Sequence, residues 1–220
     1  MVNYENEMND VLKALNDANV LENTIIVGSW SMYFYKEIFE NFVPQIATTD
    51  FDLFLPNPSK IINSNINKLL IDLDYYRSDD FLTGKTRFYS KKGFEIEFLT
   101  LPKRNSTDVV KIKNANIGAE ALPKMLPIKW NYITIKYHNL NINIPSPASY
   151  CLQKLLINKD RKEAKQKRDI DSVKYVLGFV ALSTKYKAEF LDLLNRAPKK
   201  WAKIINETIK KNNLDFIFDK

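Results

Sequence analysis

The 220-residue chain has few of the residues from which disulfides and metal centres are usually built. It contains one cysteine, Cys151, and one histidine, His138. The single cysteine excludes an intramolecular disulfide and a multi-cysteine zinc site, and the single histidine argues against a histidine-based metal centre. Glycine is also scarce, with five residues, and Gly84-Lys85-Thr86 lacks the preceding glycine of a Walker loop. Any bound metal ion would therefore need oxygen ligands.

Long apolar runs are missing as well. Stretches such as residues 176–182 are far shorter than the roughly 20 residues that a membrane helix needs. The polar start, residues 1–9, does not resemble a signal peptide. Hydrophobic residues make up 45% of the chain and aromatic residues 12%, which is enough for a core. We expect a globular, cytoplasmic protein with no membrane partner.

Basic residues gather in the last third of the chain. Residues 1–144 contain 16 basic and 17 acidic residues, whereas residues 145–220 contain 17 basic and 9 acidic residues. Such a segment is either a set of solvated helix faces in a lysine-rich sequence or a surface that binds an anionic partner. The composition alone leaves both interpretations open.

Hydrophobic periodicity predicts two parts that meet near Pro145-Ser146-Pro147. Residues 1–145 alternate between helical and strand patterns and are expected to form an α/β domain; residues 146–220 show only helical periodicity and are expected to form a basic helical domain. Strands are expected at 24–27, 50–55, 86–90 and 94–99, with a hairpin joining 132–137 to 140–144. Helices are expected at 7–18, 31–41, after Pro58, and at 148–158, 163–177, 186–194 and 199–211.

Two carboxylates on one predicted strand indicate a cation site. The first predicted strand ends at Gly28-Ser29, and the second begins with Asp50-Phe51-Asp52. Because side chains alternate along a strand, Asp50 and Asp52 project to the same face. They repel each other unless a cation lies between them, and Mg²⁺ is often held by one or two carboxylates together with phosphate oxygens. The pattern predicts a divalent cation beside a phosphate-binding turn.

A later strand supplies candidates for a third carboxylate. Glu95 and Glu97 share one face of the strand at 94–99, and Phe94 and Ile96 share the other. This strand is either an ordinary antiparallel strand with one solvated face or the source of the third acidic ligand of a two-metal site. Lys85 and Arg87 precede it and could approach a nucleotide.

Gly28-Ser29, Thr49-Asp50-Phe51-Asp52-Leu53 and Ile96-Glu97-Phe98-Leu99 together resemble the nucleotidyltransferase superfamily of DNA polymerase β, and most closely its small bacterial toxin-type members from abortive-infection systems. The resemblance implies an α+β fold in which helices flank a mixed sheet and a helical module follows. It implies that Gly28 and Ser29 bind the triphosphate, that Asp50 and Asp52 bind two Mg²⁺ ions, with Mn²⁺ as a substitute, and that Glu97 completes the second metal site. Glu97 is preferred to Glu95 because the Phe-Leu-Thr-Leu-Pro after it resembles the end of the third motif.

The resemblance continues into the helical domain. Residues 147–156, followed by Arg161 and Arg168-Asp169-Ile170-Asp171, are similar to the helix pair of toxin-type members in which a lysine reaches the nucleotide phosphates. Lys154 is the corresponding residue here.

The resemblance implies an enzyme that moves a nucleoside monophosphate from a nucleoside triphosphate to an acceptor hydroxyl and releases pyrophosphate. The basic last third favours an RNA acceptor such as tRNA, and a toxin would have a cognate antitoxin as its partner. Two alternatives stay open: a catalytically silent module of this fold that binds nucleic acid or a protein, and a glycosyltransferase that uses Asp-x-Asp to hold a metal and a nucleotide sugar.

Overall fold

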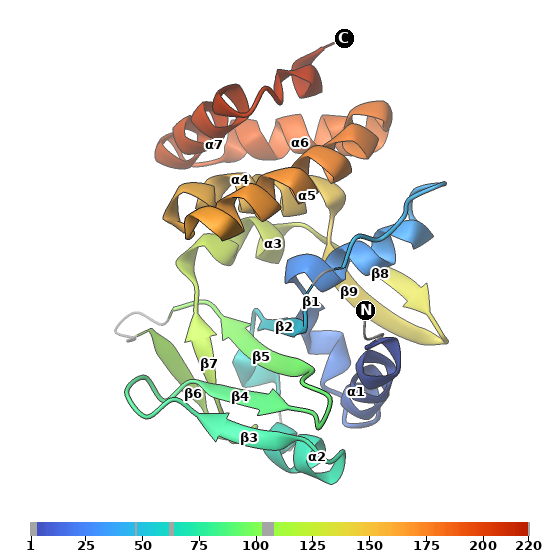
Figure 1. Ribbon diagram of the computed structural model, residues 1–220, viewed down its shortest axis with the longest axis vertical. Helices are drawn as coiled ribbons and strands as arrows, with labels where there is room; N and C mark the ends of the chain where they lie inside the picture. Colours follow the sequence, from blue (N-terminus) through green and yellow to red (C-terminus); the bar gives the residue numbers. More distant parts are fainter. Residues whose placement is uncertain (1–3, 47, 62–63, 103–107, 220) are drawn as a thin grey trace. The chain divides into compact units, whose positions relative to one another are not determined.

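The chain divides into two compact units in the computed structural model, which describes residues 4–46, 48–61, 64–102 and 108–219 (Figure 1). Unit 1 comprises Met1–Pro123 and Ile133–Ile144, and unit 2 comprises Lys124–Tyr132 and Pro145–Lys220. The chain passes from unit 1 to unit 2 for the second time after Ile144, one residue before the domain boundary that the sequence predicts. The segment Lys124–Tyr132, which the prediction placed in the first domain, belongs to unit 2.

Unit 1 is built on a mixed sheet, in which nine strands lie within the described residues. Their order is β3-β4-β5-β2-β1-β9-β8, with β7 beside β5 and β6 beside β7. The strands are β1 (Ile25–Ile26), β2 (Asp50–Leu55), β3 (Tyr76–Asp79), β4 (Thr86–Tyr89), β5 (Glu95–Thr100), β6 (Val109–Ile112), β7 (Ile117–Ala121), β8 (Tyr132–Tyr137) and β9 (Leu140–Pro145). The pair β2 and β5 is parallel, whereas β4 and β5 are antiparallel.

The strands with clear alternation lie where the sequence predicts them. Strand β2 covers the predicted residues, and β4 and β5 differ from prediction by one residue at their ends. The predicted hairpin is β8 and β9, and its turn residues His138 and Asn139 have φ values of 45° and 65°. Two successive left-handed residues are typical of a two-residue type I′ turn, which matches the twist of the strands that it joins.

The helices of unit 1 include one correction to the prediction. Helix α1 (Glu5–Asp17) buries Met8, Val11, Leu12 and Leu15, a helical spacing, and α2 (Ile66–Asp72) begins after Asn65, whose side chain accepts a hydrogen bond from the Lys68 amide. Residues 31–41 were expected to form an ordinary helix, but the segment is a 3₁₀ helix, η2 (Gly28–Glu37). Aromatic residues, which favour the α-helix weakly, dominate it. The remaining 3₁₀ turns of unit 1 are η1 (Leu21–Asn23) and η3 (Pro58–Lys60); the prediction after Pro58 includes residues 62–63, which lie outside the described residues.

An aromatic cluster forms the core beneath β2 and β5. The rings of Trp30, Phe51 and Phe94 contact one another with centroid separations of 5.5 to 5.9 Å, and Tyr4 stacks on Phe94 at 5.4 Å. Trp30 is 4% exposed and Phe51 is fully buried. The aromatic residues after Gly28 therefore pack into the core, and this packing holds η2 against β2.

The turn between β3 and β4 is organised by one carboxylate. An oxygen of Asp80, Oδ1, accepts hydrogen bonds from the amides of Leu82 and Thr83 at 3.0 and 2.7 Å and from the Thr83 hydroxyl at 2.9 Å. These bonds, led by that of the Thr83 amide, hold the pKa of Asp80 below its ordinary value. Gly84 follows with a φ of +74° and donates its amide to the Asp80 carbonyl. The turn thereby sets the pairing of Asp79 with Thr86.

Unit 2 consists of helices arranged around a central one. Helix α4 (Pro147–Ile157) is buried at every position from Pro147 to Leu156 and contacts the other four helices of the unit; a helix that is apolar nearly all round is expected at the centre of a bundle. Ser146 caps it by accepting the Ser149 amide at 3.1 Å. The other elements are η4 (Pro123–Met125), α3 (Leu126–Trp130), η5 (Asn158–Asp160), α5 (Glu163–Leu182), α6 (Thr184–Arg196), α7 (Lys199–Lys211) and η6 (Asp215–Phe218). None of the helices in the described part of the chain is long and apolar enough to cross a membrane.

We expect Phe51→Ala to lower the free energy of unfolding by about 3 to 5 kcal/mol, because it leaves a cavity between Trp30 and Phe94. Denaturant titration measures this change. Phe81→Ala is the matched control: Phe81 is 99% exposed at the β3–β4 turn, so its loss should change the free energy by no more than about 0.5 kcal/mol. Equal losses in the two variants would contradict the assignment of Phe51 to the core.

Candidate active site

Parallel pairing of β2 with β5 decides which carboxylates meet. Asp50 lies opposite Glu95, and Asp52 lies opposite Glu97. Because side chains alternate along both strands, these four residues share one face of the sheet. Phe51 and Ile96 project from the other face and are fully buried. The structure thus brings together, in two neighbouring rows, the four acidic residues that the sequence analysis considered.

The Gly28 turn lies directly against the second aspartate. Gly28 has a φ of +67°, and a Cβ atom at this position would lie 2.5 Å from Asp52 Oδ2. The amide of the preceding residue, Val27, donates to the Asp52 carbonyl at 3.0 Å, and Ser31 Oγ donates to the Gly28 carbonyl at 2.8 Å. Only glycine combines this backbone conformation with so close an approach. The predicted turn and the predicted Asp-x-Asp strand are therefore in contact.

Strand β4 adds two positive charges to the same face. It pairs with β5 so that Arg87 lies opposite Glu97. Arg87 Nε donates to Glu97 Oε1 at 2.5 Å and lies 3.2 Å from Glu95 Oε1. Lys85 Nζ donates to Glu97 Oε2 at 2.7 Å and also forms an ion pair with Glu120. Both oxygens of Glu97 are therefore bound to cations.

The two glutamates of β5 differ in proton affinity. Burial tends to raise the pKa of Glu97, but hydrogen bonds from Lys85 and Arg87 outweigh this effect and hold the pKa below its ordinary value. For Glu95, burial raises the pKa, and the neighbouring Glu97 and Asp50 raise it further. Glu97 is thus a fully ionised, paired carboxylate, and Glu95 holds a proton more readily.

Asp50 and Asp52 fit a divalent cation, whereas Glu97, the predicted third ligand, is paired with Lys85 and Arg87. The two aspartates supply hard oxygen donors on one strand face beside the Gly28 turn, and hard oxygen donors are the ligands that Mg²⁺ requires. The oxygens of Glu97 are turned to Arg87 and Lys85 instead. Across residues 4–46, 48–61, 64–102 and 108–219, no three acidic, histidine or cysteine side chains are grouped to hold a metal ion.

Lys154, the predicted nucleotide ligand of the helical part, lies inside unit 2. Its side chain is 7% exposed, and its Nζ atom bonds Asp169 Oδ1 at 2.6 Å. Arg161 Nε approaches the other oxygen of Asp169 at 3.3 Å. Nucleotide binding by Lys154 would therefore require Asp169 to release it.

Sequence reasoning missed part of the charged cluster. It identified Lys85 and Arg87 as residues near a nucleotide, but their pairing with Glu97 depends on the register between β4 and β5. Glu120 was not considered at all, because its strand β7 was not predicted; β7 lies beside β5 with Glu120 opposite Leu99. The available signal was the spacing of Lys85 and Arg87, which places both on one face of a strand.

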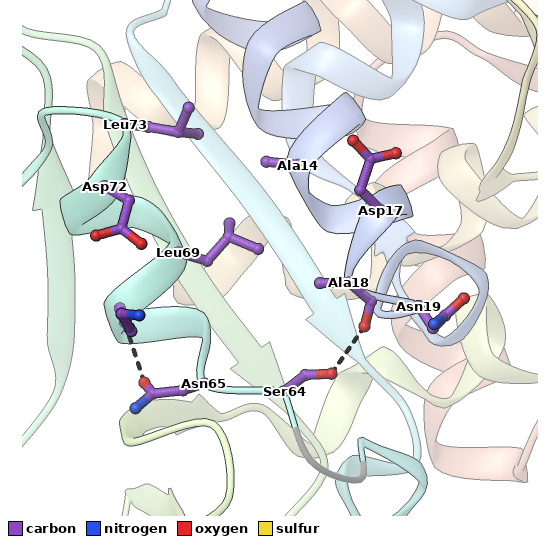
Figure 2. A pocket seen from close by; sticks show the side chains of 10 residues that line it. Ala14, Asp17, Ala18, Asn19, Ser64, Asn65, Leu69, Asp72 and Leu73 are labelled. Atoms are coloured by element: carbon purple, nitrogen blue, oxygen red, sulfur yellow. Dashed lines mark hydrogen bonds between the residues drawn. The ribbon is translucent and has the colours of Figure 1, made fainter.

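A cavity of 790 Å³ lies elsewhere in unit 1, between the end of α1 and the start of α2 (Figure 2). Ser64 Oγ donates to the Ala18 carbonyl at 2.8 Å and ties the two segments together. Asp17 and Asp72 reach its rim from the two helices, and both are exposed. None of the predicted site residues lines this cavity, so it forms no part of the candidate active site.

A mixed sheet with a Gly-Ser turn after one strand and an Asp-x-Asp pair on the next strand, followed along the chain by a helical unit, defines an α+β nucleotidyltransferase fold. A family model described as nucleotidyltransferase matches residues 6–199, and the chain belongs to this family.

Two solved structures are similar to the chain. One is an antigenic nucleotidyltransferase-like protein from Paracoccidioides brasiliensis, with 15% identity, a TM-score of 0.48 and 91% of each chain covered. The other is the antibiotic-resistance factor ANT(2'')-Ia, with 9% identity and a TM-score of 0.42, covering 94% of this chain and 91% of that one. No curated protein matches the sequence significantly.

We expect Gly28→Ala to disturb the Asp52 carboxylate, since the added methyl group meets the end of this flexible side chain. Gly84→Ala is the matched control, because Gly84 has a similar φ of +74° but no atom within 4 Å of the added Cβ. Both variants should lose about 1 to 2 kcal/mol of stability through backbone strain. Gly28→Ala alone should weaken Mn²⁺ binding, about tenfold or more, in a titration followed by electron paramagnetic resonance. Equal weakening in both variants would contradict the contact.

Proposed function

We propose that the protein transfers a nucleoside monophosphate from a nucleoside triphosphate to an acceptor hydroxyl and releases pyrophosphate. Membership of the nucleotidyltransferase family supports the reaction class. The observation that carries the proposal is the contact between the Gly28 turn and Asp52, with Asp50 on the same strand face. This contact brings a candidate phosphate-binding backbone and two cation ligands into one place.

In the proposed reaction, the acceptor oxygen forms a bond to the α-phosphorus, and the bond from that phosphorus to the oxygen leading to the β-phosphate breaks. The Gly28 backbone and Ser29 bind oxygens of the β- and γ-phosphates, which orients the leaving pyrophosphate. Asp50 and Asp52 would hold a Mg²⁺ ion, or Mn²⁺ in its place. The ion would supply positive charge that offsets the negative charge of the triphosphate. The proton of the acceptor hydroxyl passes to Glu95 of β5, because both oxygens of Glu97 are already bound by Lys85 and Arg87.

An RNA end, such as that of a tRNA, is the acceptor that we propose. Helix α7 carries five lysines on its exposed positions: Lys199, Lys200, Lys203, Lys210 and Lys211. One acidic residue, Glu207, lies on the same helix and approaches Lys203 at 3.9 Å. A face with this excess of positive charge suits a polyphosphate backbone, because binding there releases the counterions of the nucleic acid. A small cationic acceptor would be repelled by it.

We expect Asp50→Asn to abolish pyrophosphate release, with a loss of about 100-fold or more, because the amide lacks the charge that a divalent cation needs. The assay combines each of the four ribonucleoside triphosphates with Mg²⁺ and total tRNA. Asp72→Asn, an exposed aspartate on α2, is the matched control and should leave the rate unchanged. Circular dichroism and denaturant titration establish that both variants are folded.

Three results of this assay separate the alternatives. Full activity in Asp50→Asn would overturn the proposed site. Release of a nucleoside diphosphate from a nucleotide sugar, without pyrophosphate, would indicate a glycosyltransferase. RNA binding that survives the loss of Asp50 and Asp52, in a protein that releases no pyrophosphate, would indicate a catalytically silent binding module.

If RNA binds to the exposed lysines of α7, its affinity should depend on the salt concentration. Changing Lys199, Lys200 and Lys203 together to Gln should weaken RNA binding and reduce the slope of log affinity against log salt by about 0.7 for each lost phosphate contact. Fluorescence anisotropy with a labelled single-stranded RNA measures both. Changing Lys111, Lys113 and Lys136 of unit 1 to Gln removes the same charge from other exposed positions and should leave the slope unchanged. An affinity that does not depend on salt would argue against an RNA acceptor.

A further inference from the structure

Glu97 is already neutralised by the protein itself. Arg87 Nε binds one of its oxygens at 2.5 Å, and Lys85 Nζ binds the other at 2.7 Å. The Glu97 side chain is 15% exposed and that of Lys85 is 11% exposed, so water screens this pair much less than a surface pair. Because both oxygens of Glu97 already have cationic partners, the carboxylate does not need a divalent ion to balance its charge.

Lys85 is shared between two carboxylates from different strands. Its ammonium group binds Glu97 of β5 and Glu120 of β7. Burial favours the neutral amine, but the hydrogen bonds from Lys85 to Glu120 and Glu97 outweigh burial, so the pKa of Lys85 stays above its ordinary value. Lys85 is therefore a permanent cation at neutral pH. Two carboxylates that meet at one cation are the arrangement usually associated with a bound metal ion.

The two cations that hold Glu97, Lys85 and Arg87, also oppose a second divalent ion near it. Asp50, Asp52 and Glu95 remain beside the Glu97 pair, with Arg87 reaching Glu95 at 3.2 Å. An additional dication on Glu97 would lie next to the charges of both Lys85 and Arg87, and like charges at such separations repel strongly where water is excluded. It would have to displace at least one of them.

We propose that Lys85 takes the place of the second divalent ion, so that the active site binds one ion through Asp50 and Asp52 and uses Lys85 as its built-in second cation. This inference rests on the function proposed above. Lys85 is a positioning residue: it acts through Glu97 and Glu120, holding their carboxylates in place without exchange with solvent ions.

Counting bound Mn²⁺ tests the inference. Equilibrium dialysis against Mn²⁺ and saturating α,β-methylene nucleoside triphosphate, with the Mn²⁺ of each chamber measured by electron paramagnetic resonance after acid release, gives the excess of ions in the protein chamber and hence the number bound to each chain. We expect one ion for the wild type and two for Lys85→Met, in which Glu97 and Glu120 are left to bind a metal. Lys111→Met, a change at an exposed lysine of β6, is the matched control and should bind one ion. Lys85→Met should also make pyrophosphate release depend on a higher Mg²⁺ concentration.

Two ions on the wild-type chain would overturn the inference while leaving the proposed function intact. One ion on a folded Lys85→Met variant would also overturn it, because Lys85 would then act in folding alone. If Lys85→Met does not fold, the double variant with Lys85→Met and Glu120→Gln removes the excess negative charge that Lys85→Met leaves. The number of ions bound to the wild-type chain tests the inference without any variant. Failure of the proposed function is distinct: the wild type then releases no pyrophosphate with any acceptor, whatever the number of ions.

Discussion

The parallel pairing of β2 with β5 is the constraint on which the candidate site depends. It places Asp50 and Asp52 beside Glu95 and Glu97, although these carboxylates repel one another. At about 4 Å, two such charges cost about 1 kcal/mol in water and about 4 kcal/mol near a protein surface. Each large apolar side chain on the opposite face contributes about 1.5 to 3 kcal/mol when buried, and Phe51, Phe94, Ile96 and Phe98 are all buried. The aromatic core therefore outweighs the repulsion and holds the acidic residues together.

Positive charge is distributed unequally over this acidic face. The glutamate side receives Lys85 and Arg87 from β4, whereas the aspartate side meets the bare backbone of the Gly28 turn. The chain belongs to the nucleotidyltransferase family, and the two sides of the acidic face differ in the charges that the protein places beside them. The glutamates are held by cations that belong to the protein, and Asp52 lies against the Gly28 turn.

The sequence predicted those parts of the fold whose signal is local. Helices of unit 2 follow from their spacing of apolar residues, and β2 follows from the alternation of polar and apolar residues over Asp50–Leu53. Strand β3 was not predicted because its residues are largely exposed on both faces, and β6 and β7 were not predicted because buried and exposed residues do not alternate regularly along them. The acidic residues of the site could be predicted because alternation alone places them on one face. The binding of Glu97 by Lys85 could not, because it depends on the register of β4 against β5, which joins residues through long-range pairing.

The Asp80 turn has a consequence for the charge of the site. A strand that slips by one residue presents its other face, because side chains alternate with a period of two. If β4 shifted in this way, Phe88 would enter the polar row, and Lys85 and Arg87 would be directed toward the apolar core. The hydrogen bonds of Asp80 to Leu82 and Thr83 oppose this slip. Substitutions of the exposed side chains of Phe81 and Leu82 should therefore have little effect on the site. An insertion or deletion of one residue in this loop would instead replace Lys85 and Arg87 on the acidic face with Phe88.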